Sequence, residues 1–411
     1  MSSIRFAWRN MWRNKRRTVI TLIALAANTA ILIATFALME GYVHNAISYV
    51  TDLILGEAQI HKTEYLEDNS IYRTIDNPAP ILARAESLGI KATPRLYGYG
   101  LLSSGKKSAG ALFTGIYPDS ETQAFSLDEH VMEGEFLKSD SAKKVVLGKK
   151  LAKTLDVTIG SELVVLVQAA DGSLGTDIFF VDGILKAAGD KIDRATAFFR
   201  QEDFRELFVM DASMNMQDSV HEIALNSFGK VELSKMKGKF ADVTGDLEFK
   251  TWKELNPSIA EFMYQAEKSI IIFAWIFFIV AALGIMNTML MATYDRIREL
   301  GILKAIGATP LRILTDVLTE AVLLTILATV FGLIAGVLLS WYFQVHGIDT
   351  RGTGGDMSFA GVAFDPIWKA SLSLRAIYIP VTMMWAISVL GAFYPASIAA
   401  RLKPVEAINH I

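Results

Sequence analysis

The stretch TVITLIALAANTAILIATFALM, residues 18–39, holds no charged side chain. A helix needs about 20 apolar residues to cross the hydrocarbon core of a bilayer, so this stretch predicts a membrane span. Three further uncharged stretches lie in the last third of the chain, at residues 269–294, 321–342 and 376–400. Polar sequence separates the first stretch from the other three. The order predicts one span, then a folded domain outside the bilayer, then three more spans.

The composition agrees with two kinds of sequence in one chain. Apolar residues make up 52% of the chain and charged residues 20%, with a mean hydropathy of +0.34, which is high for a soluble protein. The net charge of −3 gives no indication of nucleic-acid binding. The absence of Cys excludes disulfides, thiol chemistry and Cys-ligated zinc. The six His are scattered without ligand spacing, so we expect no metal site.

Basic residues beside the spans predict the orientation of the chain. They gather in residues 1–17, in the loop at 295–312 and in the tail at 401–411. Because short segments rich in Lys and Arg stay in the cytoplasm, both termini and this loop are expected there. The expected divisions are a basic amphipathic helix at 1–17, spans at 18–42, 266–294, 313–343 and 375–400, an outer α/β domain at 43–265, a cytoplasmic helix at 295–312, an outer loop at 344–374 and a tail at 401–411.

A cleaved signal peptide is the alternative interpretation of the first span. The basic residues that precede the stretch and the small residues around Ala24 and Ala26 fit that interpretation. The apolar run, however, continues to Leu38, which is longer than the apolar region of about 7–15 residues in a signal peptide. We therefore favour a retained span.

Residues before the first span have the pattern of an amphipathic helix. Apolar and aromatic residues recur at helical spacing from Ile4 to Trp12, and arginines line another face. A helix with Trp on one side and Arg on the other is typical of the membrane interface. The sequence leaves open whether it only anchors to lipid or also contacts a cytoplasmic partner. The expected anchor residues are Trp8, Trp12, Arg5, Arg9 and Arg13.

Local patterns in the middle of the chain predict a mixed α/β domain. Short β-type runs bounded by Gly or Asp-Gly alternate with helical stretches. Asp171-Gly172 predicts a turn between two of the strands. The predicted strands are 145–147, 162–168, 176–182 and 220–226, and the predicted helices are 149–155 and 258–268.

The segment GLLSSGKK, residues 100–107, matches a phosphate-binding loop up to its last position. Lys107 there replaces the Ser or Thr that would bind Mg²⁺. We therefore interpret residues 103–106 as a hairpin turn. No arrangement of Ser, His and carboxylates indicates a catalytic site.

The most specific local pattern is DRIRELGILKAIGATP, residues 295–310. It predicts a short charged helix that Gly307 closes and Pro310 ends. A simple surface connector is one interpretation. Against it, large apolar residues from Ile297 to Ile306 cover more than one face, and such a helix at a membrane surface is expected to bury them against another structure.

Polar and small residues within the spans carry separate predictions. Polar groups in lipid are costly unless they are paired, so Asn28 is expected to form a hydrogen bond between helices. Glu320, at the edge of its span, is expected to reach a basic residue of the adjoining loop rather than to relay protons. Gly332 and Gly336 form a G-x-x-x-G pattern that permits close helix contact, either within one protomer or across a dimer.

Four motifs in order give the chain a resemblance to a known family. DRIRELGILKAIGATPLRI at 295–313, YPASIAARLKPVEAI at 394–408, AWRNMWRNKRRTVITLIAL at 7–25 and VVLGKKLAKTLDVTIGSELVVL at 145–166 resemble the FtsX-like and MacB-like permeases of ABC transporters. The resemblance implies a membrane protein with four transmembrane α-helices (1+3) and a MacB-like periplasmic core domain. Among these permeases, the lipoprotein-releasing type looks most similar.

The resemblance also implies how such a chain would work. A separate cytoplasmic ATPase dimer would bind ATP and Mg²⁺, so no cofactor is expected in this chain. Two permease chains, identical or different, would form the membrane part, and the helix at 295–312 would couple it to the ATPase in a bacterial inner membrane. The coupling residues implied are Arg296, Arg298, Glu299, Leu300, Gly301, Lys304, Ala305 and Gly307.

The substrate implied is hydrophobic and is handled at the outer face, with a lipoprotein or another lipid-linked molecule the first expectation. A periplasmic carrier or adaptor is a further implied partner. Two alternatives stay open. One is the efflux of small molecules or peptides through a tripartite assembly. The other is activation of a periplasmic partner without transport.

Overall fold

The computed structural model describes residues 7–9, 11–186, 190–349, 358–359, 362–363, 367–403 and 407. The chain divides into two compact units. We call the first the helical unit; it comprises Met1–Asn45, Met263–Gly352 and Ile367–Ile411. We call the second the sheet unit; it comprises Ala46–Phe262 and Thr353–Pro366.

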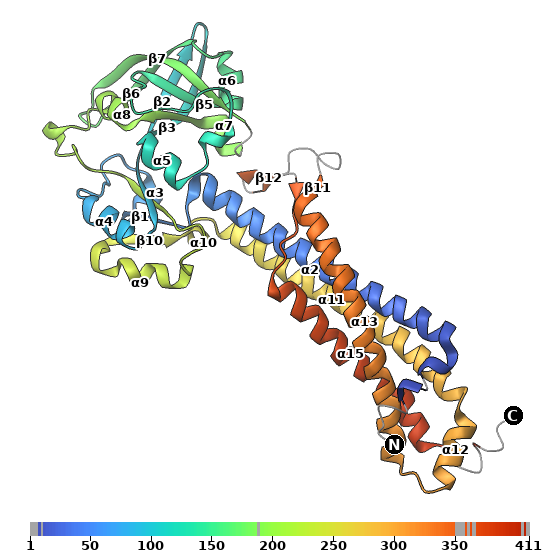
Figure 1. The fold of residues 1–411 in the computed structure, drawn as a ribbon. Helices are drawn as coiled ribbons and strands as arrows, with labels where there is room; N and C mark the ends of the chain where they lie inside the picture. Colours follow the sequence, from blue (N-terminus) through green and yellow to red (C-terminus); the bar gives the residue numbers. More distant parts are fainter. Residues whose placement is uncertain are drawn as a thin grey trace. The chain divides into compact units, whose positions relative to one another are not determined.

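Four long helices build the helical unit, namely α2 (Lys15–Val50), α11 (Pro257–Tyr294), α13 (Pro310–His346) and α15 (Leu374–Arg401) (Figure 1). Each one is long and apolar enough to cross a membrane. The predicted one-plus-three order is confirmed. The helices extend beyond the predicted spans because polar turns continue the same helix past the apolar run.

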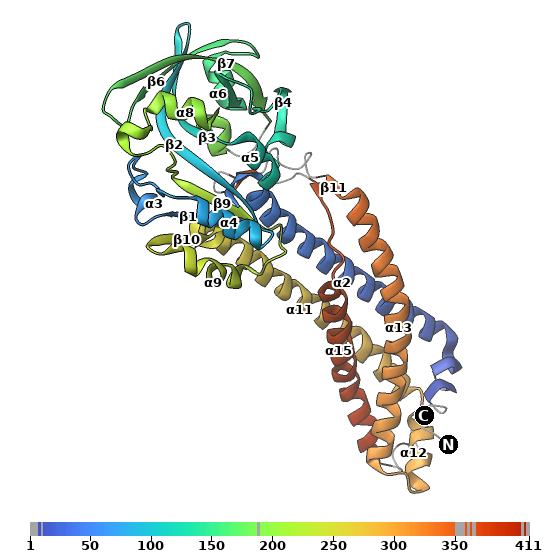
Figure 2. The ribbon, with the colours of Figure 1, turned by 60° about the vertical axis from the view of Figure 1, so that its left-hand side comes forward.

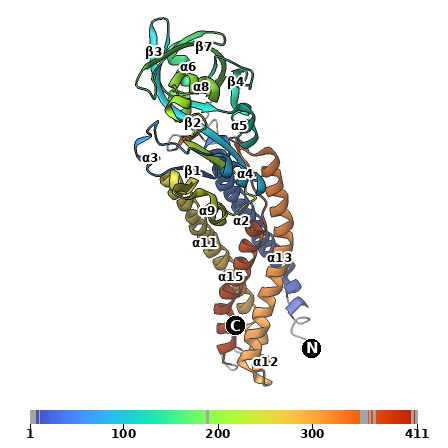
Figure 3. The same cartoon turned by 90° about the vertical axis from the view of Figure 1, so that its left-hand side faces the viewer.

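Apolar side chains cover the helices of this unit on most sides. Leu25, Ile285 and Leu324 belong to a buried cluster shared by α2, α11 and α13. Other large side chains of the same helices, such as Ile272 and Leu390, are exposed on the outside of the unit. A helix that is apolar on all sides is typical of a membrane span, where lipid covers the outward face. Figures 2 and 3 show α13 and α15 running side by side.

A ten-stranded sheet forms the sheet unit, with the strand order β10-β1-β9-β2-β3-β8-β5-β7-β4 and with β6 paired to β2 and β7. Most neighbours are antiparallel, whereas β3 with β8 and β5 with β7 are parallel. The strands are β1 (Ala58–Lys62), β2 (Lys91–Ser104), β3 (Lys107–Ile116), β4 (Val131–Gly134), β5 (Lys144–Gly148), β6 (Glu162–Gln168), β7 (Leu174–Leu185), β8 (Thr196–Arg200), β9 (Glu222–Asn226) and β10 (Leu247–Thr251).

Helices pack around this sheet and bury one large apolar core. Phe113, Phe179 and Phe199 lie at its centre and are fully buried. The helices are α3 (Tyr65–Asp68), α4 (Ala79–Ser87), α5 (Pro118–Ala124), α6 (Lys149–Leu155), α7 (Asp190–Ala195), α8 (Gln201–Phe208), α9 (Leu233–Thr244) and α10 (Trp252–Leu255), with short turns η2 (Thr51–Leu55), η3 (Asp128–His130) and η4 (Ala212–Met214).

Several local predictions are confirmed in this unit. The predicted helix at 149–155 is α6, and the predicted strand at 162–168 is β6, which pairs with β7 across the Asp171-Gly172 turn. The former phosphate-loop candidate is a β-hairpin in which Ser104 faces Lys107 and Gly105 has a φ of 57°. A positive φ is readily adopted by Gly, which explains the turn.

Other boundaries differ from the prediction. The strand predicted at 176–182 is part of a longer strand, β7, because pairing with β5 and β4 continues to Leu185. The strand predicted at 220–226 begins at Glu222, since Val220 forms only an isolated bridge with Ile75. In the loop between α13 and α15, the short strands β11 (Ile348–Asp349) and β14 (Ile367–Trp368) pair, as do β12 (Ser358–Phe359) and β13 (Val362–Ala363).

Candidate functional site

The loop between α11 and α13 contains one short helix, α12 (Ile297–Ala305) (Figure 1). Gly307, with a φ of 100°, follows it. The side chain of Thr309 then caps α13 by accepting a hydrogen bond from the Arg312 backbone N–H, and Pro310 occupies the first turn. The helix is therefore shorter than the predicted range of 295–312, because residues from Pro310 onward belong to α13.

One face of α12 packs against its own chain. Leu300 is buried in a cluster with Ile313 of α13 and Ala399 of α15. Gly301 lies so close to Ala407 that a Cβ at position 301 would be 2.6 Å from the Ala407 Cβ. Leu300 and Gly301, two of the implied coupling residues, thus help to fix the helix to the helical unit.

The opposite side of the loop exposes large apolar side chains. Ile302 is 45% exposed, Ile306 is 76% exposed and Leu311, at the start of α13, is 70% exposed. Ala305 and Gly307 are also exposed. We call Ile302, Ile306 and Leu311 the apolar tip. Such a set of exposed residues, rimmed by charge, is typical of an interaction site.

A chain of ion pairs links α12 to two other segments. Arg296 Nη1 lies 3.0 Å from Glu320 Oε2 on α13, and both side chains are largely buried. Arg296 Nε also lies 3.5 Å from Glu299 Oε2. Glu299 in turn accepts a hydrogen bond from Arg13. The predicted pairing of Glu320 with a basic residue of the loop is present in the structure.

The ion pairs affect the ionisation of Glu299. Burial alone would raise the pKa of its carboxyl group. The hydrogen bond from Arg13 and the positive charges of Arg13 and Arg296 outweigh burial and lower this pKa overall. Glu299 is therefore ionised at neutral pH.

Lys304 connects α12 to the end of α15. Its Nζ donates hydrogen bonds to the backbone oxygens of Ala400 at 2.8 Å and Leu402 at 2.7 Å. A cation at this position satisfies carbonyls that have no partner within the helix. The side chains of Arg296, Glu299 and Lys304 are thus held within the chain, whereas Arg298 is exposed. All four are among the coupling residues that the family resemblance implies.

The small and polar residues within the spans join neighbouring helices of one chain. A Cβ at Gly332 would lie 2.6 Å from the Thr29 Cβ on α2, and one at Gly336 would lie 2.9 Å from the Ile33 Cβ. Both glycines thus contact α2 of the same chain, which is one of the two contacts predicted for the G-x-x-x-G pattern. Asn28 Nδ2 lies 3.9 Å from Met384 Sδ on α15, a weak contact between helices.

The segment before α2 has a buried face and an exposed face. Ala7 and Met11 are buried, and Met11 packs in the same cluster as Leu25. Trp8 is 46% exposed and contacts Trp12 edge-on. Arg9 and Arg13 are exposed, and Arg5 lies outside the described residues. The pairing of Arg13 with Glu299 was not predicted, because no local pattern relates positions so far apart.

Together, four membrane-length helices and an α/β unit inserted in the chain after the first of them define a multi-span membrane protein with an inserted domain. Comparison with known proteins specifies the family. Residues 18–233 match the MacB-like periplasmic core domain, and residues 271–404 match the FtsX-like permease C-terminal region. The chain belongs to the family with a MacB-like periplasmic core domain, and it is an ABC transporter permease of the LolC and MacB type.

Three relatives illustrate this similarity. The lipoprotein-releasing system transmembrane protein LolC of Xylella fastidiosa is 22% identical over 96% of this chain and 94% of its own length. The pyoverdine export ATP-binding/permease protein PvdT of Pseudomonas entomophila is 24% identical over 100% of this chain and 60% of its own length. The macrolide export ATP-binding/permease protein MacB of Chromobacterium violaceum is 36% identical over 32% of this chain and 17% of its own length.

Proposed function

We propose that this chain is the transport subunit of an ABC complex in a bacterial inner membrane, and that α12 couples it to a separate cytoplasmic ATPase. The observation that carries the proposal is the apolar tip formed by Ile302, Ile306 and Leu311, which is exposed on a segment that also exposes the charged residues Arg298 and Arg312. Apolar residues at the centre of a contact and charges at its rim are the usual anatomy of a protein interface.

The contacts of α12 support a mechanical role for the helix. The Arg296–Glu320 pair ties it to α13, and Lys304 ties it to the end of α15. The Glu299–Arg13 pair ties it to the segment before α2. A displacement of α12 would therefore be passed to three elements of the helical unit. When ATP closes the partner ATPase dimer, the movement of α12 would shift the spans. That shift would do mechanical work on a substrate at the outer face.

Further parts of the proposal concern partners and substrate. The ATPase dimer would hold the ATP and Mg²⁺, and a second permease chain, identical or different, would complete the membrane part. Both termini would lie in the cytoplasm and the sheet unit in the periplasm. The substrate class would be hydrophobic, with lipoprotein extraction favoured because the similarity to LolC spans nearly all of both chains. A periplasmic carrier would then receive the substrate.

Efflux of a small molecule is the second candidate function. The observation in its favour is the 36% identity to MacB, which is higher than the identity to LolC but covers only 32% of this chain. Lipoprotein bound to the purified complex would support release, and a bound adaptor with an outer-membrane channel would support efflux.

The test is co-expression with neighbouring ATPase genes, purification in mild detergent and measurement of ATP turnover. Ile306→Asp would place a charge in the centre of the apolar tip and is expected to remove the ATPase from the purified complex. Leu174→Asp, at a site of equal exposure in the sheet unit, is the matched control and should retain it. Retention of the ATPase by Ile306→Asp would refute the assignment of the interface.

Two further variants test the coupling separately from assembly. Arg298→Ala and Glu299→Ala are expected to leave the chain inserted and the ATPase bound, while ATP turnover no longer depends on substrate. Full transport activity in both variants would contradict the coupling role of α12.

A further inference from the structure

The sheet unit contains a pocket of about 340 Å³ that the proposed transport function does not use. About half of its lining residues come from η2, α3 and the strands β2 and β3. A volume of about 300–1,000 Å³ is typical of small-molecule sites, and an apolar cavity of about 150 Å³ is enough to hold benzene. Most of the lining side chains are aromatic or aliphatic. The aromatic ones are Tyr49, Tyr65, Tyr97 and Tyr99. The aliphatic ones are Val50, Leu53, Ile54, Leu55, Leu66, Leu112, Ile192 and Leu255.

The polar groups of the pocket fall into two sets. Only Arg95 and Glu222 carry charge among the lining residues. The other polar groups are the hydroxyls of the four tyrosines, Thr114 and Thr196 and the amides of Gln59, Asn69 and Asn256. The Gln59 amide already donates a hydrogen bond to the Leu55 backbone oxygen at 2.7 Å. An apolar body with a few placed polar groups is how a ligand site is usually built.

The charged pair at the base of the pocket is already satisfied. Arg95 Nη1 donates to Glu222 Oε1 at 3.0 Å, and its Nη2 and Nε donate to Glu121 at 2.6 and 3.1 Å. Glu222 also accepts the Tyr97 hydroxyl at 3.0 Å and lies 3.2 Å from His61 Nε2. Both ions of the lining are therefore engaged by the protein.

The same contacts keep Arg95 and Glu222 ionised. Burial alone would lower the pKa of Arg95, but the charges of Glu121 and Glu222 raise it. Burial alone would raise the pKa of Glu222, but the hydrogen bond from His61 and the charge of Arg95 lower it. The guanidinium and the carboxylate stay charged, and a ligand ion would find no free counter-charge in the lining.

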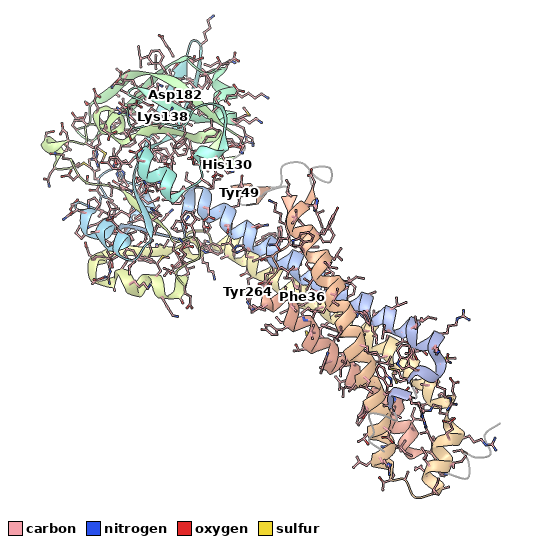
Figure 4. All side chains as sticks on the ribbon, in the orientation of Figure 1. Phe36, Tyr49, His130, Lys138, Asp182 and Tyr264 are labelled. Atoms are coloured by element: carbon pink, nitrogen blue, oxygen red, sulfur yellow. The ribbon has the colours of Figure 1, made fainter. Side chains whose placement is uncertain are left out.

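The wall of the pocket holds an unpaired hydroxyl. Thr114 is buried, and its Oγ1 has no hydrogen-bond partner among the residues that the structure describes. Buried polar atoms without partners are rare in folded proteins and call for an explanation. This oxygen is itself fully buried, so a molecule in the pocket would meet other atoms of Thr114 rather than its hydroxyl. Figure 4 places Tyr49, another wall residue, beside His130, with 5.7 Å between the ring centroids.

We propose that this pocket binds an uncharged amphipathic small molecule, with an apolar body against the tyrosines and leucines and a hydroxyl, carbonyl or amide end toward the amides of Asn69 and Asn256. A charged ligand is disfavoured because burying an unpaired ion costs much more than burying a hydrogen-bonded neutral group. The pocket lies wholly within the sheet unit, so this proposal stands independently of the ATPase interface.

The experiment uses the full chain in lipid nanodiscs with three photoreactive probes. The probes share one eight-carbon chain with a diazirine and differ only in the end group, which is a carboxamide, an ammonium or a carboxylate. Mass spectrometry of the labelled peptides locates the site. We expect the carboxamide probe to label peptides of η2, α3 and β2, to be displaced by unlabelled octanamide, and to label them at least about five times more than either charged probe.

Two variants and two controls test the location. Leu66→Trp would fill the pocket, and Tyr99→Ala would remove an aromatic wall that is 64% exposed and thus tolerant of change. Each should reduce carboxamide labelling at least about fivefold. Leu174→Trp and Tyr72→Ala, the latter at a site that is 61% exposed, lie outside the lining and should leave labelling unchanged.

Three outcomes would overturn the proposal. Equal labelling by a charged probe would refute the ligand class. Labelling that survives both pocket variants, or that maps only to the membrane helices, would refute the site. Circular dichroism establishes that each variant is folded, and Tyr99→Ala alone decides the matter if Leu66→Trp does not fold.

Discussion

Replacing Gly332 with Ala tests the packing of α13 on α2. The added Cβ would lie 2.6 Å from the Thr29 Cβ and 2.8 Å from the Ala26 backbone oxygen. Carbon atoms in contact are best separated by about 3.5–4.0 Å, so the two helices would have to move apart by about 1 Å. The backbone oxygen of Ala26 cannot turn aside as a flexible side chain could, and the clash therefore has to be absorbed by the helices themselves.

The magnitude follows from two opposing effects. Ala in place of Gly within a helix stabilises it by about 0.5–1 kcal/mol, because the unfolded chain loses freedom. Overpacking a tight contact costs about 1–3 kcal/mol. A Cβ at Gly284 of α11 would meet no atom within 4 Å, so Gly284→Ala has the first effect without the second. The difference between the two variants isolates the packing cost, about 1–3 kcal/mol.

The assay is equilibrium unfolding of the full chain in mixed micelles, followed by circular dichroism and tryptophan fluorescence. Gly284→Ala is expected to be as stable as the natural chain or slightly more stable. Gly332→Ala is expected to be less stable than Gly284→Ala by the amount given above. Equal stability of the two variants would refute the contact between α2 and α13 and would return Gly332 to the alternative of a contact between two chains.

Three other changes have defined outcomes. Glu320→Gln removes the closer of the two carboxylates that the largely buried Arg296 contacts and should lower the free energy of unfolding by up to about 3–5 kcal/mol, with partial recovery in Arg296→Gln/Glu320→Gln when the same unfolding assay is used. The exposed pair of Arg13 and Glu299 should contribute only about 0.2–1 kcal/mol in a double-mutant cycle. Folding lowers the pKa of Glu299 from 4.5, so the contribution of the pair should be full above pH 4.5. It should be lost as the pH falls through the lower pKa of Glu299 in the folded protein. A contribution that grows on acidification would contradict the pairing. Thr114→Val removes a buried hydroxyl that has no partner among the described residues and should stabilise the unliganded protein by about 1 kcal/mol, as measured by thermal unfolding of the full chain, and a loss of stability would show that the hydroxyl is satisfied.

The membrane helices and several elements of the sheet unit could be predicted because their signals are local. Uncharged stretches long enough to span a bilayer mark the four helices, and Thr309 and Pro310 mark the start of α13. The hairpin at Gly105 likewise follows from turn residues between two β-type runs. Such signals involve residues close together in the chain, so one sequence is enough to read them.

The remaining features depend on residues that are distant in the chain. Strand β1 lies between β9 and β10, an order that no local pattern determines. Arg95, Glu121 and Glu222 meet in a buried cluster although each looks like an ordinary charged residue in its own segment. The role of Lys304 in capping α15 was missed for the same reason, since a lysine in a charged loop predicts exposure.

The loop helix shows what a local pattern can and cannot assign. The apolar residues of α12 were predicted to be buried against another structure. Leu300 instead faces α13 and α15, and the exposed apolar surface is provided by Ile302 and Ile306 together with Leu311. Helical periodicity identifies faces, but it does not say which face the same chain covers.

Site-specific cross-linking from position 306 tests the central claim most directly. A photoreactive amino acid at Ile306, in membranes of cells that express the chain at natural levels, should form an adduct with an ATP-binding subunit, and the adduct should change in yield when ATP is trapped in the complex. The same group at Leu390, an exposed site on α15, is the control and should yield only lipid adducts or adducts with a second permease chain. Absence of an ATP-binding protein among the adducts at position 306, with the chain inserted and folded, would contradict the proposal that α12 is the coupling element.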